Sequence, residues 1–339
     1  MKKLVIFSVM ALLSLALLAS SVFASPHFSS SEEEEATQET TAQAASQAIV
    51  AAVSTRISQT FAAGFAKGTT TTAANGLKTY TSTDIGMNSG DDAGFGVWGV
   101  GSFTSFENSY TPRESDGNIA TFMAGVDTTY LGGDLLTGVS LGYENSDVSL
   151  KFSGANIDTD GYTIAPYVAY GFADGWSVDG LVAYTFQHAR KTAGTTTGSF
   201  DGERTMISTN LNYAMPYDKW IFTYTLGNLY VNSYSEDYRD STDTAHDRYS
   251  TYLGEMRLGV RADYNFNDMM TPFVGLAYLY DYTMKSEGTT HNDEDAFELT
   301  AGLDFYNQKG LTIGIDGATT LLREDITNNR VGCFLRYDF

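Results

Sequence analysis

The side chains that could do acid–base or metal chemistry in this sequence are four histidines and an excess of carboxylates, with 41 Asp and Glu against 20 Lys and Arg. His246 lies between Asp243 and Asp247 in DSTDTAHDRY, and His291 begins the acidic run HNDED. A hydrolase would need a nucleophile beside such a histidine, and no spacing in the sequence brings Ser, His and Asp together. HNDED offers carboxylates to a divalent cation but lacks the regular spacing and turn glycine of a calcium loop.

We therefore expect both histidine segments to be solvated acidic loops. We predict no catalytic residue, no metal site and no cofactor, and a hydrolase acting through His246 stays open as a distant alternative. The net charge of −21 argues against a nucleic-acid partner, since phosphates repel so acidic a chain. The single cysteine, Cys333, cannot form an intramolecular disulfide.

The elements that must position these charged groups begin at residue 93, where the hydrophobic pattern takes a period of two residues. In YTIAPYVAYGF, Tyr162 and Ile164 share one side with other large residues, opposite small residues and Tyr167. The pattern predicts twelve strands, near residues 93–106, 118–131, 134–148, 158–172, 175–190, 203–214, 219–234, 248–264, 270–285, 295–306, 310–323 and 328–339.

The connections between these strands predict how they are arranged. Short connections such as LGGD and FADG alternate with long polar ones near residues 107–117, 148–158, 190–203, 235–247, 286–294 and 323–328. This alternation indicates an all-β, antiparallel up-and-down meander with tight turns at one end and long loops at the other.

Long strands, even in number and with one polar face, match a transmembrane β-barrel. Such a sheet must close, because unpaired backbone groups are too costly in hydrocarbon. A soluble sandwich or a lipocalin-like barrel, with its aromatic side chains pointing inward, is the alternative. Aromatic residues near the strand ends favour the membrane.

Before the strands, the sequence divides into four segments. Residues 1–24 have the basic start, apolar run and small-residue cleavage site of a signal peptide. Residues 25–36 are polar and acidic, and residues 37–66 predict an Ala-rich helix. Residues 67–92 are typical of a flexible linker, which leads to the barrel at 93–339.

Charged residues fall mainly on the strand face opposite the large apolar side chains. Because a charge that faces lipid costs about 2–4 kcal/mol at mid-depth, we assign to the lumen Asp127, Glu144, Asp179, Glu255, Arg257, Asp281, Glu298, Asp304, Asp316 and Arg336. An acidic lumen of this kind would favour cations if it were open. Arg56 of the helix could pair with one of these carboxylates and hold the helix in place.

The last strand, VGCFLRYDF, alternates between two faces and should pair with the first strand to close the barrel. Arg336 and Asp338 are expected to face the lumen. The lipid face takes Val331, Cys333, Leu335, Tyr337 and Phe339.

Several segments of the strand region are similar to motifs of one outer-membrane family. GVWGVGSF at 96–103 is similar to its Trp-containing first strand, MAGVDTTYLGGDLLTGVSLGY at 123–143 to its second hairpin, and RYDF to its closing Tyr-x-Phe. With the helix and the number of strands, they resemble the β-domain, or translocator, of the type V autotransporters.

The resemblance implies roles for the helix and for the last strand. In that family the helix threads the barrel lumen and connects to an exported passenger, so the plug would be formed by Gln43, Gln47, Ala52 and Arg56. The outer-membrane barrel-assembly machinery would read the last strand through Val331, Leu335, Tyr337 and Phe339. The expected location is the outer membrane of a Gram-negative bacterium.

Two departures from the family leave the function open. Only residues 25–36 separate the signal peptide from the helix, so we expect little or no passenger, and the linker at 67–92 is long. We predict a non-enzymatic, monomeric translocator or pore domain in the lipid bilayer. The alternatives are an adhesin-like protein whose acidic loops bind host or environmental surfaces, and a cation-preferring porin.

Overall fold

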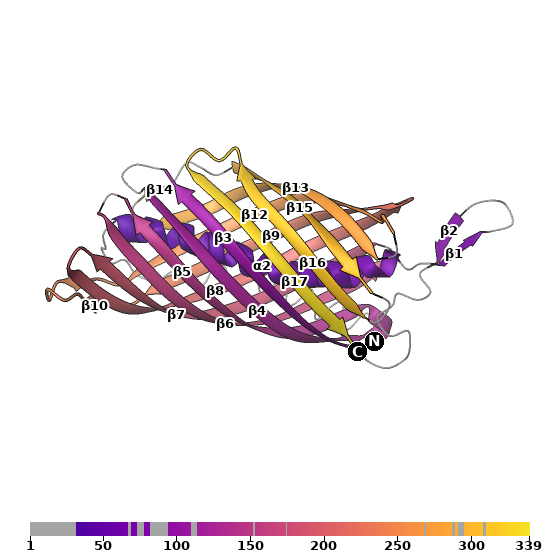
Figure 1. Ribbon diagram of the computed structural model, residues 1–339, viewed down its shortest axis with the longest axis horizontal. Helices are drawn as coiled ribbons and strands as arrows, with labels where there is room; N and C mark the ends of the chain where they lie inside the picture. The colour runs from indigo at the N-terminus through magenta and orange to yellow at the C-terminus, as the bar shows by residue number, and fades with distance from the viewer. Residues whose placement is uncertain are drawn as a thin grey trace.

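The fold is a barrel of strands that surrounds one long helix (Figure 1). The computed structural model describes residues 32–66, 69–72, 78–81, 94–109, 114–151, 153–173, 175–267, 269–286, 289–290, 295–307 and 310–339. The predicted signal peptide, the polar segment up to residue 31, His291 with its acidic neighbours to residue 294, and most of the predicted linker lie outside these residues.

Twelve long strands form the barrel wall, as the alternating pattern predicts. They are β3 (Phe95–Asn108), β4 (Ser115–Tyr130), β5 (Leu135–Leu150), β6 (Ala155–Ala173), β7 (Trp176–Ala193), β8 (Thr196–Tyr217), β9 (Trp220–Ser235), β12 (Tyr249–Tyr264), β13 (Met270–Ser286), β15 (Asp295–Tyr306), β16 (Leu311–Leu321) and β17 (Ile326–Asp338). Each predicted strand has its counterpart, so the prediction of a twelve-stranded antiparallel barrel is confirmed.

The barrel closes between its first and last strands. Consecutive wall strands pair antiparallel, and β17 pairs with β3 from Ile326 opposite Asn108 to Asp338 opposite Gly96. The backbone N–H of Phe339 adds a hydrogen bond to the carbonyl oxygen of Phe95 (2.9 Å). A closed ladder leaves the wall without a free edge, which is what hydrocarbon requires.

The two faces of the wall have opposite character. On β4, Phe122 is 58% exposed on the outside, while the next residue, Met123, is 0% exposed and points inward. Large apolar side chains cover the outside of the other strands in the same way, for example Tyr162 and Leu258. The alternative of a soluble barrel with inward aromatic side chains is therefore wrong.

Two long connections were predicted wrongly, those near residues 148–158 and 190–203, because the strands continue through most of them. Only residues 151–154 join β5 to β6, and only residues 194–195 join β7 to β8. Gly194 has a φ of +60°, a left-handed conformation that tight hairpin turns use and that glycine adopts at little cost. The hairpins extend the sheet where the sequence composition alone indicates polar loops.

Short strands lie within other connections. In the predicted linker, β1 (Thr69–Thr72) pairs with β2 (Lys78–Thr81), so this linker is not wholly irregular. Between β9 and β12, β10 (Tyr238–Arg239) pairs with β11 (Ala245–His246), and β14 (Thr289–Thr290) pairs with the end of β13. A short 3₁₀ helix, η1 (Leu131–Gly133), joins β4 to β5.

The loop between β9 and β12 is largely exposed, but Tyr238 anchors it on β8. The Tyr238 ring stacks on Phe200 and on His246, with ring centroids 4.9 and 4.4 Å apart. His246 Nε2 lies 3.2 Å from Asp240 Oδ2, and hydrogen bonds, chiefly from the Thr242 hydroxyl, hold the pKa of Asp240 well below its usual range. Residues 241–245 are exposed, which agrees with the prediction of a solvated acidic loop around His246, and the stacking of His246 on Tyr238 adds one ordered contact within it.

The helix α2 (Glu32–Ala66) lies along the barrel axis. At 1.5 Å per residue its 35 residues are about 52 Å long. It begins at Glu32 instead of residue 37, because the acidic run at 32–35 suits the positive end of the helix dipole. Among the described residues, no helix has both the length and the apolar character needed to cross a bilayer.

The direction of the outer face can be tested at Leu258, which is 62% exposed near the middle of β12. Leu258→Arg is expected to lower the free energy of unfolding in phospholipid vesicles by about 2–4 kcal/mol, because the guanidinium would face hydrocarbon. Urea titration measures the change. Thr195→Arg, at the exposed tip of the β7–β8 hairpin, is the control and should cost little. Equal costs at both positions would contradict a lipid-facing Leu258.

Candidate functional site

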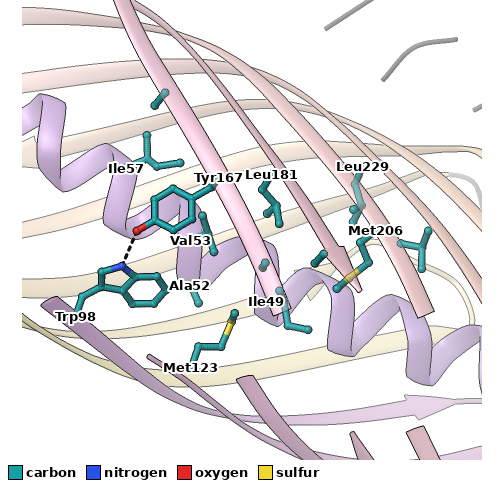
Figure 2. Packing of buried hydrophobic residues seen from close by; sticks show 14 of the residues in the cluster. Ile49, Ala52, Val53, Ile57, Trp98, Met123, Tyr167, Leu181, Met206 and Leu229 are labelled. Carbon is teal, nitrogen blue, oxygen red and sulfur yellow. Dashed lines mark hydrogen bonds between the residues drawn. The ribbon is translucent and has the colours of Figure 1, made fainter. Parts of the chain in front are cut away.

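The site is the lumen, and α2 fills it by packing one side against the wall. Ile49, Val53 and Ile57 follow one another at one helical turn and are all buried. Side chains from seven wall strands pack with this row: Trp98, Met123, Leu136, Tyr167, Leu181, Met206 and Leu229. Figure 2 shows six of them around the helix: Trp98, Met123, Tyr167, Leu181, Met206 and Leu229. Where it meets this row, the inward face of the barrel is thus apolar. This apolar zone adds to the polar, acidic lumen that the sequence indicates.

One buried ion pair ties the helix to the wall near its tight-turn end. Arg56 Nε donates to Asp127 Oδ2 over 2.6 Å, and Arg56 Nη2 pairs with Asp127 Oδ1. The Tyr167 hydroxyl donates to the same Oδ2 (2.7 Å) and accepts from Trp98 Nε1 (2.7 Å). Asp127 therefore receives three donors from the helix and the wall, which is the satisfaction that a buried carboxylate needs.

Two glycines make room for the aromatic members of this network. A Cβ at Gly138 would lie 2.3 Å from Tyr167 Cζ, and a Cβ at Gly125 would lie 2.5 Å from Trp98 Cε2. Contacts this short do not occur, so any side chain at either position would push the ring away. The absence of a side chain on β4 and β5 thus lets the two rings lie flat against the wall beneath the helix.

The last strand also reaches this anchor. Arg336 Nε donates to Asp338 Oδ1 (2.8 Å), and the same oxygen lies 3.9 Å from Arg56 Nη2. Asp127 and Asp338 thus share the positive charges of Arg56 and Arg336. Because β17 is the strand that closes the barrel on β3, the helix anchor and the barrel seam lie together.

The long-loop half of the helix is held by amide side chains. Gln43 Nε2 donates to Asp281 Oδ2 (3.0 Å) and Gln47 Nε2 to Glu255 Oε2 (2.6 Å). Gln38 Nε2 donates to the hydroxyls of Ser233 (3.1 Å) and Ser235 (2.7 Å). These bonds satisfy polar wall residues without a charge on the helix. In this half of the seat they lie beside a small apolar cluster in which Ala44 and Ala45 pack with Phe106.

A cavity of about 200 Å³ remains beside the helix, between Gln47, Val50 and Ser54 and the opposite wall. Charged pairs line it: Arg257 with Glu298, and Arg330 Nη2 with Asp316 Oδ2 (3.2 Å). The helix therefore does not fill the lumen evenly. Residues of β7–β9, such as Asp179 and Asn210, line the cavity together with those of β12–β17.

The residues predicted for the lumen all point inward. The buried ones are Asp127, Glu144, Asp179, Glu255, Asp281, Asp304 and Arg336, and the ones half-buried around the cavity are Arg257, Glu298 and Asp316. Glu144 accepts from Arg204 (2.5 Å) and Asp179 from Asn210 and Asn212 (2.8 Å each).

The predicted helix and last-strand residues lie as follows. Gln43, Ala52 and Arg56 are buried and Gln47 is half-buried, and Ala52 belongs to the apolar packing and makes no polar contact of its own. On β17 the exposed outward side chains are Val331, Leu335, Tyr337 and Phe339. Cys333 is exposed on the same face.

Three parts of the site were not predicted from the sequence: the partner of Arg56, the hydrogen bond between Trp98 and Tyr167, and the buried Arg204. Tyr167 carried a signal, because it is the one large residue on a strand face of small ones. Arg204 carried none, because a single arginine in a predicted strand does not show which carboxylate it will meet.

Comparisons with known proteins agree with this geometry. The sequence model of the Autotransporter beta-domain matches residues 94–318. Putative uncharacterized protein YaiT of Escherichia coli K12 is 27% identical over 197 residues, 53% of this chain and 19% of the relative. Uncharacterized protein YaiT of Salmonella typhimurium is 27% identical over 183 residues, 49% of this chain and 18% of the relative. The chain spans about a fifth of the length of these relatives.

Two solved structures have the same fold. The translocator domain of autotransporter NalP from Neisseria meningitidis has a TM-score of 0.63 at 14% identity, over 72% of this chain and 88% of that one. The β-domain of the Bordetella autotransporter BrkA has a TM-score of 0.61 at 19% identity, over 73% of this chain and 100% of that one. The barrel lies in the outer membrane of a Gram-negative bacterium, and the chain belongs to the autotransporter β-domain family.

Proposed function

We propose that this protein is a translocator whose pore is closed by its own helix α2. The observation that carries the proposal is the seat of the helix: an apolar row packed on the wall, and Arg56 paired with the buried Asp127 at one end. A helix held by both kinds of contact stays in the lumen at rest. The proposed cargo is a polypeptide, by analogy with NalP, which its title describes as the translocator domain of an autotransporter.

We also propose that the domain performs no catalysis. The charged groups described in the lumen are engaged with one another, with wall amides or with the helix, as Asp127 is with Arg56 and Asp179 is with Asn210. His246 stacks on Tyr238 in a folded loop. These contacts hold the helix and a loop in place, and that structural role explains each of them without a catalytic one.

The barrel-assembly machinery is the partner that we propose for the last strand. Val331, Leu335, Tyr337 and Phe339 lie in one exposed apolar row on β17. Phe339 packs on Phe95, with ring centroids 5.8 Å apart, at the seam with β3. A receptor that grips this row would hold the seam at the stage when the barrel closes.

A cation-preferring porin is the second candidate, and the charges of the lumen favour it. Around the cavity beside the helix, the carboxylates of Asp179, Glu255, Glu298, Asp304 and Asp316 outnumber the guanidinium groups of Arg257, Arg261 and Arg330. A pore lined in this way selects cations. The two candidates differ in whether the resting protein conducts.

Deleting the helix separates the two candidates. Purified full-length protein in planar bilayers is expected to be almost silent, while a variant lacking residues 32–66 opens a cation-preferring pore, because the plug is gone and the carboxylates remain. Single-channel conductance and the reversal potential in a salt gradient measure this. Equal conductance of the two proteins would contradict a plug and favour the porin.

Arg56→Met tests the anchor without removing the helix. It leaves the Asp127 carboxylate buried without its cation, which is expected to lower the free energy of unfolding by about 3–5 kcal/mol. Urea unfolding in vesicles measures the loss. The double variant Arg56→Met/Asp127→Asn keeps an acceptor for Tyr167 and removes the buried charge, so it should recover more than half of the loss. An equal loss in both variants would show that the ion pair does not anchor the helix.

A further inference from the structure

The loop between β16 and β17, residues 322–325, enters the mouth of the lumen at the long-loop end. Leu322 has a φ of +61° and its side chain is 82% exposed. This left-handed conformation is rare for a residue with a branched side chain. It sends Leu322 outward and lets the next residue, Arg323, turn inward, where its side chain is only 3% exposed.

Arg323 completes a triangle of hydrogen bonds with the helix and the wall. Its Nη2 pairs with Asp281 Oδ2 (2.5 Å), and its Nη1 donates to Gln43 Oε1 (3.1 Å). Gln43 Nε2 donates in turn to the same Asp281 oxygen (3.0 Å). One arginine thus joins a loop, the strand β13 and the outer half of α2, with a charge-assisted bond on one side.

The loop is fixed in this position from a second direction. The Ser109 backbone N–H donates to the carbonyl oxygen of Asp325 (2.9 Å), and the Ser109 hydroxyl reaches the same oxygen (3.3 Å). The connection after β3 therefore holds the far end of the loop. The backbone of the loop that carries Arg323 is thus held by a contact outside the helix.

We propose that Arg323 is a latch that keeps the outer half of the plug in the lumen. The inference rests on the proposed function, because a latch needs a plug to hold. In the polar contacts of its outer half described above, the helix contributes the amide side chains of Gln38, Gln43 and Gln47. The cation at this end therefore comes from the loop. Arg56 supplies the cation at the other end from within the helix.

Arg56 and Arg323 hold different parts of the plug. Arg56 can move only when the apolar row of α2 leaves the wall. Arg323 lies in a loop, so a change in the backbone of residues 322–325 is enough to withdraw it. Removing Arg323 frees the outer half and leaves Ile49, Val53 and Ile57 packed. The predicted result is a local opening at the mouth, with the inner half still seated.

The test uses full-length protein with Cys333→Ser and one reporter cysteine on the helix. Ala45→Cys reports the outer half, where residue 45 packs near Phe106, and Ala52→Cys reports the inner half. A membrane-impermeant maleimide is added to whole cells. Arg323→Ala is expected to raise the labelling rate at position 45 about ten- to hundredfold, the effect of losing a hydrogen-bonded charge, and to leave position 52 unchanged.

Matched variants complete the design. Arg323→Lys keeps the charge toward Asp281 and should restore slow labelling in part, and Arg239→Ala, in the β9–β12 loop, should behave like the parent. Unchanged labelling at position 45 in Arg323→Ala would overturn the latch. Equal acceleration at both positions would overturn it too, because it indicates general loosening. The conductance of the helix deletion tests the plug separately, so a silent parent with an open deletion and no effect of Arg323 rejects the latch alone.

Discussion

A sheet that crosses a bilayer has to close on itself, because hydrocarbon offers no partner for the backbone groups of a free edge. Here the closure joins β17 to β3, and it encloses a lumen wide enough for one slim helix. Closure creates a second requirement, since a lumen lined by Met123, Leu181 and Met206 must bury these side chains against something other than water. The apolar row of α2 meets that requirement.

The plug is therefore part of the hydrophobic core of this barrel. Ile49, Val53 and Ile57 belong to the largest apolar cluster among the described residues. Moving the helix away would expose apolar surface on both the helix and the barrel wall. A stopper resting in a polar channel would cost far less to move. The polar outer half, where Gln43 and Gln47 contact carboxylates, resembles such a stopper more closely. The helix is therefore held mainly by apolar packing in its middle, and by hydrogen bonds that water could replace near the mouth of the lumen.

Much of the fold could be predicted because it depends on local periodicity. Strand number, inward and outward faces, and the outward row of β17 all follow from alternation, which a single strand displays by itself. The ends of β7 and β8 could not be predicted, because polar residues such as those at 196–202 occur equally in loops and in sheet that projects beyond the membrane. A turn glycine, Gly194, was the one local signal there.

Partners inside the lumen could not be predicted, because they depend on rotation and register of the helix relative to the wall. Arg56 had several candidate carboxylates at similar depth, and only the packing of Val53 and Ile57 against Trp98 and Tyr167 turns its guanidinium toward Asp127. The apolar contacts thus set the geometry, and the buried charges discriminate among the remaining positions, since a mispaired Arg56 would leave two charges unsatisfied instead of none. Apolar burial thus stabilises the helix in the lumen, and the ion pair selects one position of the helix among those that the packing allows.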